Sequence, residues 1–421
     1  MTNKLFLRKF LVAALLIFLA LNAIAQEVFD LTHKRAKVDD FMIFPWGGVP
    51  TPDFASGAWG NMTSPTDLMK DLFDCGYNAT GFIPTKYVPA AINCRLAVIL
   101  YDERIASYPE VTPQQAEKTV QTVLNEIKSP ELRKAIYSIY IKDEPNASLF
   151  PRLSLWSEAI CKHKILPYIN LFPDYASDKQ LGSDDYEAHL DEFVNTCNPK
   201  YVSYDNYSLF AGNKFDENRF YGNLETVRKK SLQYGIPFWN VILGNTHFHY
   251  IEPSPATLGI QVYSTLAYGG KGIGYFTHYA PEIGNYRLAP IDQFGHKTKT
   301  WEMIRSINLQ IHSLASVYCT LKSVNVFHTD NVPKNAQGIE STVHLKSISE
   351  GKFLVGEFVD FNGNPYLFIV NKDIQNSVQL KVSFKKEGKI VFVSPYGKGK
   401  VRFEGEQNWL APGAGVLLTV E

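Results

Sequence analysis

The sequence has no excess of charge of either sign. Its 42 lysines and arginines equal its 42 aspartates and glutamates, so the formal net charge at pH 7 is zero. A chain without a basic excess lacks the electrostatic attraction that draws proteins to nucleic acid or to an anionic membrane surface. We therefore expect neither of these two kinds of partner.

Cysteine is scarce and irregularly spaced. An odd number of cysteines spread this widely is not a disulfide framework, and the chain has no Cys-x-x-Cys pair or Cys/His cluster typical of a zinc site. We expect free, mostly buried thiols, and neither a metal site nor a cofactor. The five residues are Cys75, Cys94, Cys161, Cys197 and Cys319.

Only one long apolar run occurs, from Phe10 to Leu21, and it is short for a membrane span. Three basic residues precede it, and the small-residue stretch Ala23-Ile24-Ala25 follows it, which is the layout of a secretory signal peptide. We expect residues 1–25 to be removed before Gln26. The mature protein would then be exported to the periplasm or the cell exterior without a membrane span.

Residues 38 to 320 alternate between strand-like and helix-like stretches. Helices begin at caps such as Ser64-Pro65 and Thr112-Pro113, and a long helix from Thr298 to Tyr318 closes the series. Eight such units suit a (β/α)8 barrel, expected over residues 26–320. No glycine-rich phosphate loop follows the first strand, which disfavours a doubly wound open sheet. The expected strands are 41–47, 77–83, 96–101, 135–141, 165–171, 201–204, 236–243 and 272–276.

The pattern changes at about Lys322, where period-2 strands replace the alternation. Examples are 353–359, 366–370 and 389–393, separated by turn signals such as Asn362-Gly363. Because no stretch of helical period intervenes, we expect an antiparallel β-sandwich domain over residues 321–421.

Two adjacent carboxylates, Asp143 and Glu144, follow the fourth expected strand, and Pro145 ends its pairing. Catalytic groups of parallel barrels gather at the carboxyl ends of the strands. Like charges this close resist double ionisation, so one acid should stay protonated near neutral pH and serve as a general acid. The other interpretation is that the pair caps the next helix together with Asn146.

A third carboxylate, Asp205, ends the sixth expected strand, two strands round the same rim from Glu144. We consider Asp143, Glu144 and Asp205 the candidate catalytic residues, although Asp-Asn is also common turn chemistry. Carboxyl groups about 5 Å apart suit a retaining glycosidase, and groups about 6.5–9.5 Å apart suit an inverting one. The sequence leaves both mechanisms open.

Aromatic residues make up 13% of the chain, and many lie near strand ends, where rings can stack on sugar faces or pack in the core. Three histidines near the last two strands, His247, His249 and His278, allow a metal interpretation, but contacts with sugar hydroxyls are favoured. The residues expected to bind substrate are Trp46, Tyr204, Asn206, Tyr207, Trp239, Asn245, His247, Tyr275 and His278.

The tripeptide Asp143-Glu144-Pro145 resembles the Asn-Glu-Pro motif at the fourth strand of retaining barrel glycoside hydrolases of the large cellulase/β-galactosidase clan. The stretch from Ala267 to Tyr279, continuing through 292–295, resembles the last strand and closing helix of many polysaccharide-degrading enzymes. The resemblance implies that Glu144 is the general acid/base. It also implies an oligo- or polysaccharide substrate.

The sequence departs from the clan at two positions. Asp143 replaces the asparagine, and the seventh strand ends Leu243-Gly-Asn-Thr-His247, without the clan's nucleophilic glutamate. An aspartate before the acid glutamate also resembles the Asp-Glu pair of substrate-assisted hexosaminidases, where it orients the substrate's acetamido group. The alternative functions are a non-catalytic carbohydrate-binding barrel protein that has lost the nucleophile, and a metal-dependent hydrolase.

Overall fold

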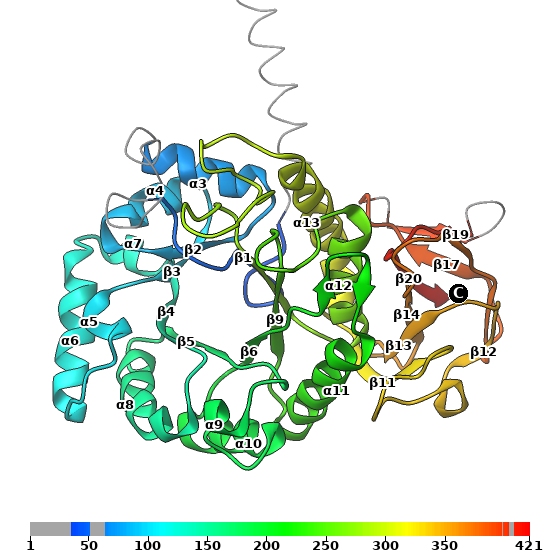
Figure 1. Ribbon diagram of the computed structural model, residues 1–421, viewed down its shortest axis with the longest axis horizontal. Helices are drawn as coiled ribbons and strands as arrows, with labels where there is room; N and C mark the ends of the chain where they lie inside the picture. Colours follow the sequence, from blue (N-terminus) through cyan, green and yellow to red (C-terminus); the bar gives the residue numbers. More distant parts are fainter. Residues whose placement is uncertain (1–34, 51–63, 398, 404–407) are drawn as a thin grey trace, which may run out of the picture. The chain divides into compact units, whose positions relative to one another are not determined.

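The computed structural model describes residues 35–50, 64–397, 399–403 and 408–421 (Figure 1). Residues 36–421 form one compact unit. The expected signal peptide, residues 1–25, lies outside the described residues. Within the described ranges, no helix is both long enough and apolar enough to cross a membrane.

Eight parallel strands form the first sheet of the described chain, and Figure 1 shows them as a ring surrounded by helices. Gly48 pairs in parallel with Phe82, and the Phe82 amide donates to the Gly47 carbonyl at 2.8 Å, which joins the first strand to the second and closes the sheet. The expected (β/α)8 barrel is confirmed. Its strands, in spatial order, are β1 (Met42–Pro45), β10 (Gly272–Phe276), β9 (Phe238–Leu243), β6 (Val202–Asp205), β5 (Leu166–Leu171), β4 (Ile136–Asp143), β3 (Ala97–Leu100) and β2 (Ala79–Ile83).

Side-chain caps start the barrel helices where the sequence predicts. Ser64 accepts a hydrogen bond from the Asp67 amide, and Thr112 forms a reciprocal capping box with Gln115. The helices are α3 (Pro65–Asp74), α4 (Val88–Asn93), α5 (Glu103–Ala106), α6 (Pro113–Glu126), α7 (Pro130–Arg133), α8 (Phe150–Cys161), α9 (Asp178–Leu181), α10 (Tyr186–Cys197), α11 (Glu217–Tyr234), α12 (Pro255–Ala267) and α13 (Lys299–Tyr318).

The inside of the barrel is filled by large side chains rather than left open. Trp239 stacks on Tyr201 with ring centroids 3.7 Å apart, at the centre of this core. Gly272 makes room for it, because a Cβ there would lie 2.4 Å from the indole of Trp239. The packed interior places any site at an end of the barrel. The core residues are Met42, Phe44, Ala79, Phe82, Ile99, Tyr168, Tyr201, Trp239 and Val241.

The expected C-terminal antiparallel sheet is also present. In the described residues it runs in the order β11 (Lys322–His328), β13 (Phe353–Val359), β14 (Pro365–Asn371), β20 (Gly415–Val420), β17 (Ile390–Val393) and β18 (Lys400–Arg402). Two short strand pairs complete the sandwich, and their Leu345, Phe384 and Leu410 pack in one core with the main sheet. These pairs are β12 (Leu345–Ile348) with β16 (Val382–Phe384), and β15 (Val378–Gln379) with β19 (Trp409–Leu410).

Glycines bring the sandwich close to barrel helix α12. A Cβ on Gly356 would lie 2.0 Å from the Ala267 carbonyl oxygen, and one on Gly413 would lie 2.2 Å from that of Ala256. Gly413 also has a φ of +65°, a conformation that glycine adopts without strain.

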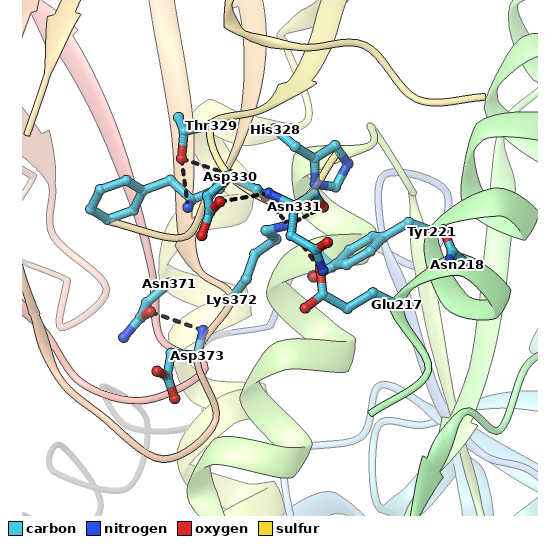
Figure 2. A network of polar contacts seen from close by, with 12 residues as sticks. Glu217, Asn218, Tyr221, His328, Thr329, Asp330, Asn331, Asn371, Lys372 and Asp373 are labelled. Carbon is cyan, nitrogen blue, oxygen red and sulfur yellow. Dashed lines mark hydrogen bonds and ion pairs between the residues drawn. The ribbon is translucent and has the colours of Figure 1, made fainter. Parts of the chain in front are cut away.

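A buried ion pair joins the same two parts of the chain (Figure 2). The Lys372 ammonium, whose side chain is fully buried, lies 2.9 Å from the Glu217 carboxylate at the start of α11. It also donates to the carbonyls of Asp330 and Asn331, at 2.8 and 3.3 Å. These partners offset the cost of burying the charge.

All five cysteines are free thiols, as expected, but only Cys75 and Cys197 are buried. Cys161, the last residue of α8, is exposed, and Cys94 and Cys319 are partly buried.

Candidate active site

One asparagine links two of the three candidate catalytic carboxylates. Asn170 on β5 lies between β4 and β6, and its Nδ2 donates to Asp143 Oδ1 at 3.1 Å and to Asp205 Oδ1 at 2.8 Å. Both carboxylate oxygens thus lie within hydrogen-bonding distance of a single nitrogen. Neighbouring strands therefore bring together carboxylates that are far apart in the sequence.

The orientation of the Asn170 amide follows from its other contacts. The Ser203 hydroxyl donates to Asn170 Oδ1 at 2.8 Å, so the NH2 group must face the two aspartates. The Tyr168 hydroxyl lies 3.1 Å from Ser203 Oγ and completes the chain inside the barrel. Tyr168, Asn170 and Ser203 are at most 1% exposed, so this support is rigid and dry.

Glu144 lies just beyond the end of β4, in an unusual backbone conformation. Its φ is +46°, a left-handed value that costs a non-glycine residue about 1–3 kcal/mol. The Glu144 amide donates to the Asn170 carbonyl at 2.8 Å, which holds this turn against β5. The side chain is partly exposed, and no described residue donates a hydrogen bond to its carboxylate.

The helix-capping interpretation does not hold for Asp143 and Glu144. Asn146 alone caps the following turn, accepting from the Ser148 amide at 3.0 Å. Its NH2 group donates to the carbonyls of Lys179 and Gln180. Asp143 and Glu144 therefore do not cap the following helical turn.

Burial raises the pKa of all three carboxyl groups. It raises the pKa of Asp143 to about 6, against the Asn170 hydrogen bond and the charge of Lys142, which lower it. Burial first, and the Asp143 charge second, raise the pKa of Glu144 to about 7. The pKa of Asp205 is raised well above its ordinary value by burial and by the charges of Glu144 and Asp143. The three groups titrate as a set that retains protons near neutral pH.

An arc of aromatic rings lies at the same carboxyl end of the barrel. Neighbouring ring centroids along it are 4.4 to 6.0 Å apart. The indole Nε1 of Trp46 is buried and has no hydrogen-bond partner in the described part of the chain. The arc comprises Tyr140, Phe82, Trp46, Phe276, Tyr207 and His247.

Of the residues expected to bind substrate, Trp46, Tyr207, Asn245 and His247 lie at this end of the barrel. The burial of Tyr207, together with the charges of Asp205, Asp143 and Glu144, raises the pKa of its hydroxyl well above the ordinary value. Asn245 is fully buried, and its Oδ1 lies 2.9 Å from Nδ1 of His247. The ring of Tyr207 also lies in edge contact with that of His247.

The other five expected binding residues have different surroundings, and we correct their assignment. Trp239 lies in the barrel core. Tyr204 is fully buried, with its ring 6.5 Å from that of Phe238. Neighbouring side chains on a strand point to opposite faces, and Asp205 points inward, so Tyr204 faces the helices.

The remaining three residues form side-chain hydrogen bonds with the barrel helices: Asn206, Tyr275 and His278. Asn206 donates to the Arg219 carbonyl and to Asn223 of α11, and the Tyr275 hydroxyl donates to Asn308 of α13. His278 Nε2 lies 2.8 Å from Asp71 of α3. Each of these polar groups has its partner in the helix layer.

Asn170 and Asp174 were expected as walls of the pocket and not as catalytic residues, and Phe82, Tyr140 and Phe276 were not expected at the site. Asn170 interrupts the apolar run of β5, and that interruption was the available signal. The sequence indicates nothing about the positions of Phe82, Tyr140 and Phe276 except that these residues are aromatic. Burial also raises the pKa of Asp174, after β5, to about 7, and the Arg219 guanidinium lies 3.1 Å above the ring of the adjacent Tyr175.

The three histidines do not converge on one point. His247 contacts Asn245, His278 contacts Asp71, and His249 stacks on Phe210 with the rings 3° from parallel. In the described ranges, no group of three or more His, Cys, Asp or Glu side chains is arranged to hold a metal ion.

Comparison with known proteins places the chain in a structural class. No protein-family model and no curated protein sequence matches it. Among solved structures it is similar to a family 39 glycoside hydrolase from Bacteroides cellulosilyticus WH2, with a TM-score of 0.51 and 10% identity over 93% of this chain and 82% of that one. The class is that of (β/α)8 barrels, and at this identity the likeness shows the fold alone.

Two other solved structures resemble the chain at lower scores. One is a β-galactosidase from Marinomonas ef1, with a TM-score of 0.46 and 8% identity over 68% of this chain and 63% of that one. The other is an endo-β-1,4-glucanase from Xanthomonas axonopodis pv. citri, with a TM-score of 0.43 and 9% identity over 65% of this chain and 99% of that one.

Proposed function

We propose that the protein is an exported glycoside hydrolase that cleaves O-glycosidic bonds of an oligo- or polysaccharide, with Glu144 as its general acid/base. One observation carries the proposal. The Glu144 carboxyl group lies at the carboxyl end of the barrel, partly exposed and without a described partner, and burial and Asp143 raise its pKa to about 7. About half of such an acid is protonated near pH 7, and the protonated form can protonate a glycosidic oxygen. The family 39 glycoside hydrolase with the same fold supports this class.

Asp143 and Asp205 would supply the remaining catalytic functions. Asp143 keeps the proton on Glu144 through its charge, and Asp205 lies two strands round the barrel, held by Asn170. In a retaining mechanism Asp205 attacks the anomeric carbon that Glu144 activates. In the substrate-assisted mechanism Asp143 instead orients an acetamido group, whose carbonyl oxygen attacks. Both mechanisms agree with a β9 that ends without a carboxylate.

The sugar would lie against the aromatic arc. Trp46 and Tyr207 are partly exposed and lie on either side of Phe276 in that arc, with rings suited to a pyranose face. For the mature protein we propose that residues 26–320 form the catalytic domain and residues 321–421 the sandwich domain.

Turnover by a Glu144→Gln variant tests the proposal. The amide keeps the shape of the side chain but cannot donate a catalytic proton, so hydrolysis of aryl glycosides and natural glycans should fall about 100- to 10,000-fold. Glu131→Gln on α7 is the matched control, because Glu131 is exposed and, among the described residues, forms an ion pair only with Lys134. Unchanged turnover by Glu144→Gln would remove the catalyst and with it the proposal.

A non-catalytic carbohydrate-binding role is the second candidate. It is favoured by the burial of Asp205, which is only 6% exposed, and by the missing carboxylate after β9. A glycan that binds the wild-type protein and the Glu144→Gln variant equally, and that neither protein hydrolyses, would establish this role instead.

A further inference from the structure

A chain of three polar side chains connects the ends of β9 and β10. The Thr277 hydroxyl lies 2.7 Å from the Tyr279 carbonyl oxygen and 2.8 Å from Asn245 Nδ2. Asn245 Oδ1 lies 2.9 Å from His247 Nδ1. Thr277 is 8% exposed, His247 3% and Asn245 fully buried, so water competes little for these bonds.

The Tyr279 carbonyl oxygen, at one end of this chain of side chains, determines the direction of each hydrogen bond in it. A carbonyl oxygen only accepts, so the single hydrogen of the Thr277 hydroxyl goes to Tyr279. The hydroxyl oxygen must then accept from the NH2 group of Asn245. Asn245 therefore presents its carbonyl oxygen to His247, and the ring nitrogen Nδ1 must carry the hydrogen.

The remaining ring nitrogen of His247 is consequently an acceptor. Neutral imidazole carries one hydrogen, so Nε2 has a bare lone pair, and no described residue donates to it. Burial, followed by the charge of His249, lowers the pKa of His247 to about 4, so the ring stays neutral.

Five aromatic rings surround this acceptor. The ring of Tyr286 is stacked on His247 at 5.0 Å, and the others lie 4.9 to 6.0 Å away. They come from the end of β10 and from the segments after β6, β9 and β10. The charge of Asp205 helps to raise the pKa of Tyr207, one of these five residues. The other rings are those of Tyr207, Phe248, Tyr250 and Phe276.

We propose that His247 determines substrate specificity by accepting, through Nε2, a hydrogen bond from one sugar hydroxyl, and that Asn245 and Thr277 are positioning residues that keep Nε2 free of hydrogen. The inference rests on the proposed function. It also narrows the substrate to a sugar with a free hydroxyl at this position. A carboxylate or sulfate oxygen has no hydrogen to donate, so its lone pairs would face the lone pair of Nε2, which is unfavourable in a buried site.

Nitrogen NMR of 15N-histidine-labelled protein tests the tautomer and the contact together. A His247→Gln variant identifies the His247 signals among the ten histidines of the sequence. At pH 7 we expect Nδ1 to be protonated and Nε2 bare. We expect the Nε2 signal to move when a sugar from a panel is added, but not with the same sugar deoxygenated or sulfated at the contacting position. The panel is glucose, galactose, mannose, xylose, fucose, N-acetylglucosamine and N-acetylgalactosamine.

Substitutions at Thr277 test the positioning role. Thr277→Ser retains the hydroxyl and should behave as wild type. Thr277→Val removes it, so the Asn245 amide can rotate and the His247 tautomers should mix. KM of a cleaved glycoside should then rise about tenfold, as for one lost hydrogen bond, with kcat nearly unchanged. An unaltered tautomer in Thr277→Val would refute the positioning role.

The outcomes separate this inference from the proposed function. A protonated Nε2, or an Nε2 signal that no sugar moves, overturns the inference even if hydrolysis depends on Glu144. A sugar-dependent shift of Nε2 without hydrolysis of any glycan supports the His247 contact and overturns the hydrolase proposal instead.

Discussion

Asp143 and Asp205 accept hydrogen bonds from the same nitrogen, Nδ2 of Asn170, at 3.1 and 2.8 Å. Burial disfavours the charge of both carboxyl groups, and the hydrogen bond from this nitrogen lowers both pKa values against that effect. The shared donor therefore makes the ionised forms accessible at a site where three acids compete for charge. Asn170 acts through the two aspartates and positions them.

Replacing Asn170 by alanine should alter the pH dependence of hydrolysis. Without the donor, the pKa values of Asp143 and Asp205 rise further, so the acidic limb of the pH–kcat/KM profile should move to higher pH. Ser203→Ala removes the bonds of the Ser203 hydroxyl to Asn170 Oδ1 and to the Tyr168 hydroxyl but leaves the Asn170 donor in place, so it should shift the limb less. An acidic limb that stays in place in Asn170→Ala would show that neither aspartate needs to ionise.

Glu144→Gln should stabilise the folded protein at high pH. Because the pKa of Glu144 is raised from 4.5 to about 7 in the folded state, ionisation is disfavoured there, and stability falls as the pH rises from about 4.5 to about 7 and is level above that. The variant should be about 1–2 kcal/mol more stable than wild type at pH 8, allowing for solvent screening, and equally stable near pH 4. Urea denaturation at the two pH values measures this. A variant that is less stable at pH 8 would contradict the raised pKa.

Lys372 and Glu217 should contribute unequally to stability. Glu217→Gln leaves the fully buried Lys372 ammonium without its counter-charge, a loss worth about 3–5 kcal/mol in buried pairs. Lys372→Met leaves Glu217, whose side chain is 19% exposed and can be hydrated, so it should cost less. Chemical denaturation of both variants compares the two costs, and equal costs would argue against burial as the cause.

Trp46→Ala should weaken substrate binding. Loss of the indole removes both ring contact and the unpaired Nε1 donor, so KM for a cleaved glycan should rise about three- to tenfold. Trp46→Phe keeps a ring but no donor and separates the two effects. If KM does not change in either variant, the aromatic arc does not contact the sugar.

The strands and helix starts could be predicted from the sequence because the signals are local. Ser64 and Thr112 cap helices through residues three positions away, and β10 was expected at its observed bounds, 272–276. The direction of side chains was harder to predict. β9 is buried along its whole length, so its sequence shows no alternation to indicate which residues face inward. Trp239 was therefore assigned to the site although it fills the core.

The sequence by itself determined the order of strands and helices, the change to an antiparallel β-domain, and the adjacency of Asp143 and Glu144. Only the tertiary structure decided that Asn170 joins Asp143 to Asp205, and that Tyr275 and His278 face helices. The reason is that hydrogen bonds between side chains depend on strand register and on the face each residue occupies. Contacts between neighbouring strands of a closed barrel set both of these.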